Sequence, residues 1–378
     1  MEIPFNIPPV VGTEKDFIEA AINKRRLCGD NFYTKACSRL LEEKYSAVKA
    51  LLTPSCTHAL EMAALLCEIK PGDEVIMPSF TFVSTANAFV LRGAKIIFVD
   101  IRPDTQNIDE KQIEAAITDK TRAIVPVHYA GVGCEMDAIL DIAKAYSLKV
   151  VEDAAQGVNA YYKGRALGTI GDFGTYSFHE TKNYTMGEGG ALLVNSGDNV
   201  LSAEIIREKG TNRAEFLLGM ADKYTWVNHG SSYLPSELGA AFLYAQLQQA
   251  EQINDARMER YRQYYFGLRE LEKRGCISLP VVPDGCTHNA HMFYIKTRDF
   301  KQRCAFMAYM KQRGIACAFH YVPLHTSPFG RKCSSFCGED RHTTRTFETL
   351  VRLPMYKDLT KDDVDYVLEN IYAFFKGK

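Results

Sequence analysis

The sequence has no excess of charge of either sign. Its 45 lysines and arginines are balanced by 46 aspartates and glutamates, so the formal net charge is -1 and the pI is near 6.8. Proteins that bind nucleic acids usually carry a basic patch and a high pI, so we expect no nucleic-acid partner. No apolar run approaches the ~18 residues of a membrane span, and the first residues lack the basic start and apolar core of a signal peptide. We therefore expect a cytoplasmic protein that does not bind membranes.

Cysteine is present, but its spacing does not suggest a metal site. The 11 cysteines are an odd number and lie scattered along the chain. Cys333 and Cys337 form the closest pair, and Cys28 and Cys37 the next. Neither pair has a matching second pair at the spacing of a zinc site. We interpret the cysteines as reduced thiols and expect no metal.

Short apolar runs alternate with amphipathic stretches through the first two thirds of the chain. The runs are rich in valine and isoleucine, and they lie at residues 74–77, 95–99, 123–127, 149–152, 174–178 and 191–194. Such runs predict buried, largely parallel strands. The intervening stretches predict helices at residues 57–69, 84–92, 109–116 and 136–146. This alternation indicates an α/β sheet with helices on its faces.

The pattern changes after about residue 233. Residues 236–272 predict one or two long helices. They are followed by strand-like residues 292–296 and 315–320 and by helix-like residues 300–313, 343–352 and 361–375. Residues 323–341 show no regular pattern, and we expect a loop there. We therefore expect a large α/β domain at residues 1–245 and a smaller C-terminal α+β domain at residues 246–378.

Two residues near predicted strand ends point to pyridoxal phosphate (PLP) chemistry. Asp153 ends an apolar strand, and Lys182 follows a second short strand further along the chain. A PLP enzyme needs a lysine that holds the cofactor aldehyde as a Schiff base and an acid that keeps the pyridine nitrogen protonated. Taken singly, the aspartate could be a helix cap and the lysine a solvated surface group. Their pairing at the carboxyl ends of strands favours a cofactor site, because ligands of open α/β sheets bind there.

Weaker signals accompany this pair. Residues 53–59 open a predicted helix with small and hydroxyl side chains, which suits a phosphate but is equally explained by helix capping. An aromatic residue within 78–83 could stack on a ring or pack in the core. His128 follows a strand, and a hydrogen-bonded structural role is the favoured explanation. His320 and Tyr321 lie beside a turn and suggest the polar wall of a substrate site.

Together these motifs resemble one family. The chain is similar, essentially from end to end, to the sugar-nucleotide aminotransferases of PLP fold type I. The resemblance is carried by residues 53–60, 78–82, 126–128, 151–156, 177–183, 187–190 and 320–325. Within the family, residues 27–30, 210–213 and 230–234 resemble the dTDP-4-amino-4,6-dideoxygalactose transaminases of enterobacterial common antigen synthesis.

The resemblance implies roles for individual residues. Lys182 would form the Schiff base and later shuttle a proton, and Asp153 would pair with the pyridine nitrogen. The other implied cofactor contacts are the phenolic-oxygen neighbour Gln156, the stacking Phe82, the backbone N–H groups of Cys56 and Thr57, and the hydroxyl of Ser177. Ser232 stands where many members carry an asparagine that reaches the neighbouring subunit's phosphate. The implied substrate contacts are Arg213, His320 and Tyr321, and the implied assembly is a homodimer with shared active sites.

The implied reaction is a ping-pong transamination. L-glutamate would donate the amino group, and dTDP-4-keto-6-deoxy-D-glucose would become dTDP-4-amino-4,6-dideoxy-D-galactose. Three alternatives stay open. The first is an enzyme that aminates position 3 or gives the gluco product. The second is a sugar dehydratase, although such relatives carry histidine where this chain has Lys182. The third is a regulatory or binding protein with the PLP fold.

Overall fold

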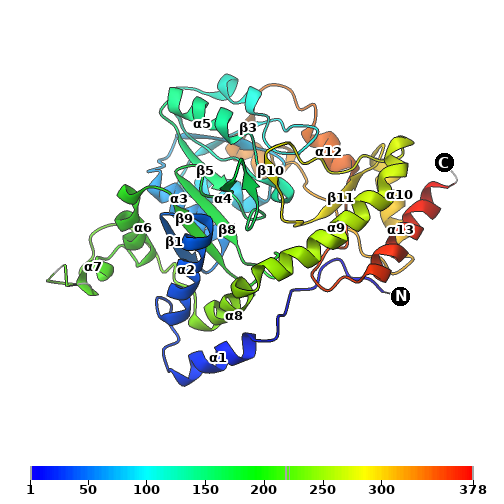
Figure 1. Ribbon diagram of the computed structural model, residues 1–378. Helices are drawn as coiled ribbons and strands as arrows, with labels where there is room; N and C mark the ends of the chain where they lie inside the picture. The colour runs from blue at the N-terminus through cyan, green and yellow to red at the C-terminus, as the bar shows by residue number, and fades with distance from the viewer. Residues whose placement is uncertain (1, 218, 221, 377–378) are drawn as a thin grey trace.

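An eight-stranded sheet forms the centre of the computed structural model, which describes residues 2–217, 219–220 and 222–376 (Figure 1). Its strand order is β1-β9-β8-β5-β4-β2-β3-β12. The strands are β1 (Lys49–Thr53), β2 (Glu74–Pro78), β3 (Lys95–Val99), β4 (Thr121–Ile124), β5 (Lys149–Asp153), β8 (Phe173–Ser177), β9 (Gly190–Val194) and β12 (Ser334–Phe336). Strand β9 runs antiparallel to β1 and β8, and the other neighbouring pairs are parallel. The expected largely parallel sheet is thus confirmed.

Both faces of the sheet are covered, which explains why its strands are apolar throughout. Successive residues of a strand enter two different hydrophobic clusters, as Val75 and Ile76 of β2 do. One face packs on helices α2, α5 and α8, and the other on α3, α4 and α6. The helices of this part are α1 (Glu14–Asn23), α2 (Phe32–Tyr45), α3 (Cys56–Leu66), α4 (Val83–Val90), α5 (Met136–Ala145), α6 (Val200–Arg207), α7 (Arg213–Leu217) and α8 (Glu237–Gln248).

A third hydrophobic cluster lies in the C-terminal part, where α9, α10 and α13 gather at one end of the molecule (Figure 1). They pack with a two-stranded antiparallel sheet of β11 and β13. The elements are α9 (Ala250–Lys273), β11 (Phe293–Lys296), α10 (Phe300–Lys311), α11 (Gly330–Cys333), α12 (Thr343–Thr349), β13 (Leu350–Leu353) and α13 (Lys361–Phe375). A small sheet of β10 (Cys286–Thr287), β6 (Tyr161–Tyr162) and β7 (Arg165–Ala166) joins this part to the loop after β5.

The first residues of the chain pack with its last third. Ile3 is fully buried in the third cluster, and its backbone pairs with Gly314 and Ala316. The division into residues 1–245 and 246–378 stays a proposal. The separate hydrophobic clusters support this division. The segment around Ile3 is an exception, because it packs with the C-terminal part although it lies at the start of the sequence.

Several expected elements differ from the structure. Residues 315–320 form no strand and make only isolated bridges, such as the one between Ala318 and Arg352. Residues 109–116 form the short 3₁₀ turns η1 (Glu110–Gln112) and η2 (Glu114–Ala116), because the chain is already extended at Ile117. The helix expected at residues 343–352 ends at Thr349, since the next residues pair with β11.

Two strands of the large sheet were not predicted. Strand β1 pairs with β9, and β12 lies in the segment expected to be a loop. The three residues of β12 carry no periodic signal, and their pairing with β3 joins segments far apart in the sequence. Within the described residues no helix is long and apolar enough to cross a membrane.

Candidate active site

A cavity of about 640 Å³ opens at the carboxyl ends of β5 and β8, between the large sheet and the C-terminal part. This is the edge at which open α/β sheets bind ligands. The cavity gathers residues that are distant in the sequence. Those predicted from the sequence that line it are Cys56, Thr57, Phe82, Asp153, Gln156, Ser177, Lys182, His320 and Tyr321.

Asp153 lies at the base of the cavity with its carboxylate fixed on both sides. It ends β5 and is 6% exposed. Its Oδ2 accepts a 2.7 Å hydrogen bond from Oγ1 of Thr85, and its Oδ1 accepts one from the backbone N–H of Ala155 at 3.1 Å. A carboxylate oxygen can accept more than one hydrogen bond. The oriented carboxylate can therefore also accept a hydrogen bond from a ligand in the cavity.

Lys182 faces the same cavity from the loop between β8 and β9. Its backbone N–H is bound to the carbonyl of His179 at 2.9 Å, whereas its Nζ has no hydrogen bond or ion pair with a described residue. Burial lowers the pKa of the Lys182 ammonium, and this outweighs the opposing effects of Cys56 and Asp153. A lysine amine is nucleophilic only when it is neutral, so this lowered pKa suits Schiff-base chemistry.

An anion cradle lies at the start of α3. Ser55 caps the helix, and its Oγ accepts the backbone N–H of His58 at 3.2 Å. The N–H groups of Cys56 and Thr57 are the first two of the helix and have no partner within it. A Cβ at Gly190 would lie 2.4 Å from the Cys56 nitrogen, so glycine allows β9 to pass against this helix end. Free N–H groups and the positive end of a helix suit a phosphate.

His320 and Arg352 form a wall of the cavity, and the buried Tyr129 lies behind His320. The guanidinium of Arg352 donates to Nε2 of His320 at 2.6 Å. Because a guanidinium can only donate, the proton of the ring is on Nδ1, which lies 3.3 Å from the hydroxyl of Tyr129. Burial, followed by the neighbouring Arg352, lowers the pKa of His320 far below its usual range, so the ring is neutral.

Arg352 is a half-buried cation that has no acidic partner among the described residues. It forms no ion pair with any described residue, its Nε is buried without a hydrogen bond, and its guanidinium lies 4.6 Å from the centre of the Phe5 ring. Burial lowers the pKa of the Arg352 guanidinium, against the opposing effects of Tyr129 and Tyr321. Such a group can hold an anion in the cavity.

Gln156 and Tyr321 fix each other on the same wall. The Gln156 carbonyl oxygen accepts the backbone N–H of Ala130 at 2.6 Å, and its amide nitrogen donates to the Tyr321 hydroxyl at 3.1 Å. Phe82, which precedes α4, is more than half exposed and faces the cavity. Ser177 ends β8, and its Oγ accepts the N–H of His179 at 3.4 Å.

Arg213 and Ser232 do not line the cavity of this chain. Arg213 begins α7 and lies 3.8 Å from the carboxylate of Glu208, and Ser232 is exposed and forms a backbone bridge to the same glutamate. Helix α7 projects from the body of the molecule (Figure 1). A contact from either residue to this cavity would need a second copy of the chain, and it therefore belongs to the proposals below.

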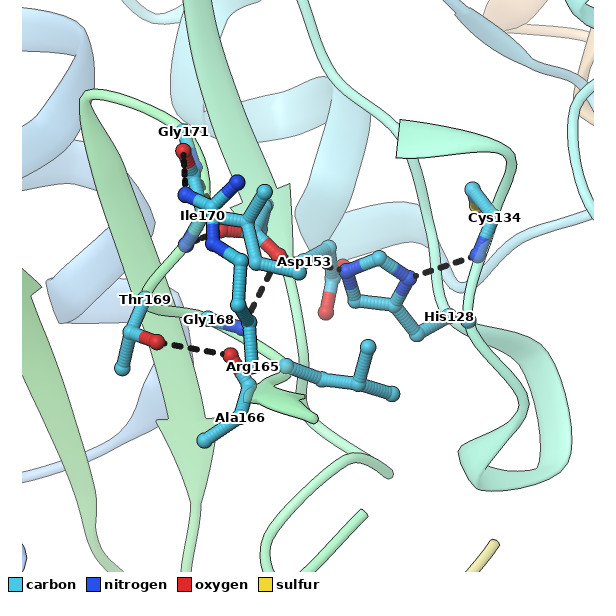
Figure 2. Close-up of polar contacts among 12 residues, drawn as sticks. His128, Cys134, Asp153, Arg165, Ala166, Gly168, Thr169, Ile170 and Gly171 are labelled. Atoms are coloured by element: carbon cyan, nitrogen blue, oxygen red, sulfur yellow. Dashed lines mark hydrogen bonds and ion pairs between the residues drawn. The ribbon is translucent and has the colours of Figure 1, made fainter. Parts of the chain in front are cut away.

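His128 is a structural residue outside the cavity. Its Nδ1 accepts the backbone N–H of Cys134 at 3.1 Å (Figure 2), so its Nε2 carries the proton and donates to Glu152 at 2.8 Å. The fully buried Glu152 also accepts the N–H groups of Gly168, Ile170 and Gly171. This network braces the strand that carries Asp153.

Three residues of the site were missed by the sequence analysis. Thr85 gave no signal, because one threonine in a helix is ordinary. Arg352 interrupts the apolar run Leu350–Leu353, and a charge within a buried strand was a usable signal. His291 precedes β11 and also lines the cavity. Among the described residues no group of His, Cys, Asp and Glu could hold a metal ion.

The cavity therefore offers a lysine with an unpaired amine, an oriented aspartate and an anion cradle. These three groups fit the aldehyde, ring nitrogen and phosphate of PLP. The solved structures that share this fold are those of PLP-dependent aminotransferases, among them the aminotransferase TlmJ from Streptoalloteichus hindustanus. It matches with a TM-score of 0.90 and 25% identity, and it covers 99% of both chains.

The chain belongs to the DegT/DnrJ/EryC1/StrS aminotransferase family, whose pattern matches residues 14–372. It is 37% identical over 322 residues to the uncharacterized protein MJ1066 of Methanocaldococcus jannaschii, which covers 83% of each chain. It is 33% identical over 346 residues to the spore coat polysaccharide biosynthesis protein SpsC of Bacillus subtilis, which covers 88% of this chain and 86% of that protein. The protein is a sugar aminotransferase, and PLP is its cofactor.

Proposed function

We propose that the enzyme transfers the amino group of L-glutamate to C4 of dTDP-4-keto-6-deoxy-D-glucose. The product would be dTDP-4-amino-4,6-dideoxy-D-galactose, an amino sugar of enterobacterial common antigen synthesis. The observation that carries the transamination is the unpaired amine of Lys182 in the same cavity as the oriented carboxylate of Asp153. The choice of sugar is supported by the resemblance at residues 27–30, 210–213 and 230–234.

PLP supplies an aldehyde and an electron-withdrawing ring to this site. Lys182 would hold the aldehyde through Nζ, and its free amine would take the proton from the α-carbon of the amino donor. Asp153 would hold the ring nitrogen and keep it protonated. The backbone N–H groups of Cys56 and Thr57, with the Ser177 hydroxyl, would hold the phosphate. Phe82 and Gln156 would contact the ring.

Arg352 supports an amino acid as the donor. Because its guanidinium has no carboxylate partner among the described residues, a carboxylate of L-glutamate can pair with it in the cavity. His320 and Tyr321 line the same wall and would then contact the sugar when it replaces the amino acid. The two half-reactions would thus use one cavity in turn.

The active enzyme is proposed to be a homodimer with shared sites. The described residues 210–217, 219–220 and 222–233 are here called the arm. They include three exposed large apolar side chains, those of Phe216, Tyr224 and Trp226, the last being 79% exposed. An exposed apolar group on a projecting segment is typical of a protein interface. In this proposal Arg213 and Ser232 of one arm complete the cavity of the partner. The cytoplasmic location likewise stays a proposal based on the sequence.

The shared site can be tested by mixing two inactive variants. Lys182→Ala lacks the Schiff-base amine, and Arg213→Glu carries a defective arm. If each arm serves the partner, a mixed dimer contains one site with both Lys182 and Arg213, and activity returns on mixing. Activity that stays absent after subunit exchange contradicts the proposal.

The proposed function is tested by the absorbance of the PLP-loaded protein. Addition of L-glutamate without sugar should bleach the visible cofactor band, and dTDP-4-keto-6-deoxy-D-glucose should then restore it. Lys182→Ala should show neither change. A product with a 3-amino group or gluco configuration by NMR would replace the proposed sugar chemistry. Release of ammonia would indicate a dehydratase, and a band that ignores every amino donor would indicate a binding role.

A further inference from the structure

His291 lies beside Lys182 but has no part in the chemistry described above. It precedes β11 in the C-terminal part, is 5% exposed and lines the same cavity. Its ring is bound to Asn183, the residue that directly follows Lys182, through a 2.9 Å contact between Nδ1 and Oδ1. The ring of His291 is therefore one of the contacts that join the C-terminal part to the lysine loop.

Neighbouring hydrogen bonds determine which ring nitrogen of His291 carries the proton. The amide nitrogen of Asn183 donates to the backbone carbonyl of Asn289 at 2.8 Å, which leaves its Oδ1 facing the ring. An amide oxygen can only accept, so Nδ1 of His291 must be the donor. The other nitrogen, Nε2, is then an unprotonated acceptor.

The same network holds the ring rigidly in this state. The Asn289 side chain donates to the carbonyls of Gln156 and Val158 and accepts the backbone N–H of His291 at 3.0 Å. The buried Arg257 donates to the carbonyl of His291 at 2.7 Å. The backbone on which the ring is mounted is thus fixed from two sides.

Nε2 of His291 has no hydrogen-bond partner among the described residues, and the same is true of Nζ of Lys182. Burial lowers the pKa of His291 well below its usual value, and Lys182 has the largest effect among the charged neighbours, ahead of Arg352 and Arg257. The ring therefore stays neutral and stays an acceptor. An unpaired acceptor and an unpaired donor thus face the same cavity, and the ring that carries the acceptor is bound to the residue after Lys182.

We propose that His291 is a positioning residue that accepts a hydrogen bond through Nε2 from the free amine of Lys182. The proposal rests on the role of Lys182 in the proposed function and adds the group that aims it. With one N–H held by the ring, the amine has fewer orientations, and its lone pair can be directed at the carbon from which it takes a proton. Because the N–H of Nδ1 remains bound to Asn183, Nε2 stays the ring nitrogen that accepts from the amine.

Loss of this acceptor changes the pKa of Lys182 in a defined direction. The charged or titratable groups that act on the lysine are the Cys56 thiol of α3, Asp153 of β5 and Arg352 of β13, together with the neutral rings of His291 and His320. A hydrogen bond from the ammonium favours the charged form, so removal of the acceptor lowers the pKa further. The acidic limb of the donor half-reaction should then move to lower pH.

The experiment compares PLP-loaded His291→Leu and His291→Gln with the native enzyme. Bleaching by L-glutamate is followed in single turnovers as a function of pH. We expect His291→Leu to shift the acidic limb down by about one pH unit and to lose about tenfold in the plateau rate, from the usual strength of such contacts. His291→Gln keeps an oxygen near the position of Nε2 and should stay close to the native profile. His288→Leu removes a half-buried histidine outside the cavity and is the matched control.

An unchanged acidic limb in His291→Leu overturns the proposal, as does an equal shift in His291→Gln or His288→Leu. A second measurement covers the case in which the leucine variant does not fold. In the native holoenzyme labelled with ¹⁵N-histidine, the His291 signal, assigned from the glutamine variant, should show protonated Nδ1 and bare Nε2. A proton on Nε2 overturns the proposal, and this result does not depend on whether L-glutamate is the donor.

Discussion

The hydroxyl of Thr85 donates a 2.7 Å hydrogen bond to Oδ2 of Asp153, so helix α4 holds the carboxylate at the end of strand β5. Thr81 lies 2.8 Å from the same hydroxyl, and both threonines are buried. Since Thr85 must donate to the carboxylate, Thr81 donates to Thr85. The orientation of Asp153 thus depends on a chain of two hydroxyl groups.

Thr85→Val should weaken PLP binding by about tenfold, because hydrogen bonds to charged groups contribute ~1.5–3 kcal/mol. Valine keeps the shape of threonine, so folding should be preserved. The dissociation constant can be measured by titrating the PLP-free protein and following the visible band. Thr85→Ser retains the hydroxyl and serves as the control. A native PLP affinity in the valine variant would contradict this account of Asp153.

Lys182→Met should stabilise the PLP-free protein while it abolishes turnover. Burial lowers the pKa of Lys182 below the ordinary 10.5, so between the lowered and ordinary values the unfolded chain binds more protons than the folded one. The contribution of this lysine to stability therefore rises with pH across that window. Methionine carries no proton and removes both the penalty and this part of the pH dependence, with a gain of about 1 kcal/mol.

Urea unfolding of the two PLP-free proteins measures this difference in the free energy of unfolding. The measurements should run from about pH 7 to about pH 10, which covers about three pH units below the ordinary lysine pKa. The stability curves should converge as pH rises. A methionine variant that is less stable than the native protein at pH 7 would show that the buried Lys182 ammonium does not destabilise the PLP-free protein.

Arg352→Met should impair the half-reaction with L-glutamate. The loss of a buried, charge-assisted pair should raise the L-glutamate concentration needed for half-maximal bleaching by about a hundredfold. Arg352→Lys keeps the charge but not the forked geometry and should fall between the two. Arg298→Met removes an exposed guanidinium paired with Asp299 and is the control. If the methionine variant binds L-glutamate normally, the donor carboxylate is held elsewhere.

Glu152→Gln should destabilise the protein without touching the cavity. The Glu152 carboxylate accepts four hydrogen bonds, all from N–H groups. In the glutamine variant an NH₂ group replaces one carboxylate oxygen, so some of these N–H groups would face another donor and lose their acceptor. A cost of ~2–4 kcal/mol is expected for such a buried mismatch. Thermal unfolding of the holoenzyme measures it. Glu204→Gln, which weakens a partly exposed pair with Lys49, should cost less than ~1 kcal/mol.

The sheet and the two central residues of the site could be predicted because their signals are local. Buried parallel strands appear as valine-rich runs, and the carboxyl end of such a strand marks where a ligand binds. Asp153 and Lys182 both lie where this reasoning placed them, at one cavity beyond β5 and β8. Their chemical roles follow from residue type and stay predictions until the variants are measured.

The partners of these residues could not be predicted, because they depend on tertiary contacts. Arg352 reaches the cavity only when β13 is brought over the end of β5, and the proton position on His291 depends on Asn183. Strand β12 is another example, since three residues gain a strand conformation by pairing with β3. Arg213 and Ser232 lie outside the cavity of a single chain, and their proposed contacts would depend on a second copy.

The burial of Ile3 against the last third of the chain has a consequence for biosynthesis. Its backbone partners are Gly314 and Ala316, and the ring of the nearby Phe5 packs against the guanidinium of Arg352. A ribosome makes the N-terminal residues first and those partners near the end of translation. The leading segment therefore stays unpaired while most of the polypeptide is made, and the wall of the cavity closes only at the end. Nascent chains interrupted before β13 would carry the lysine and aspartate of the enzyme but no finished pocket.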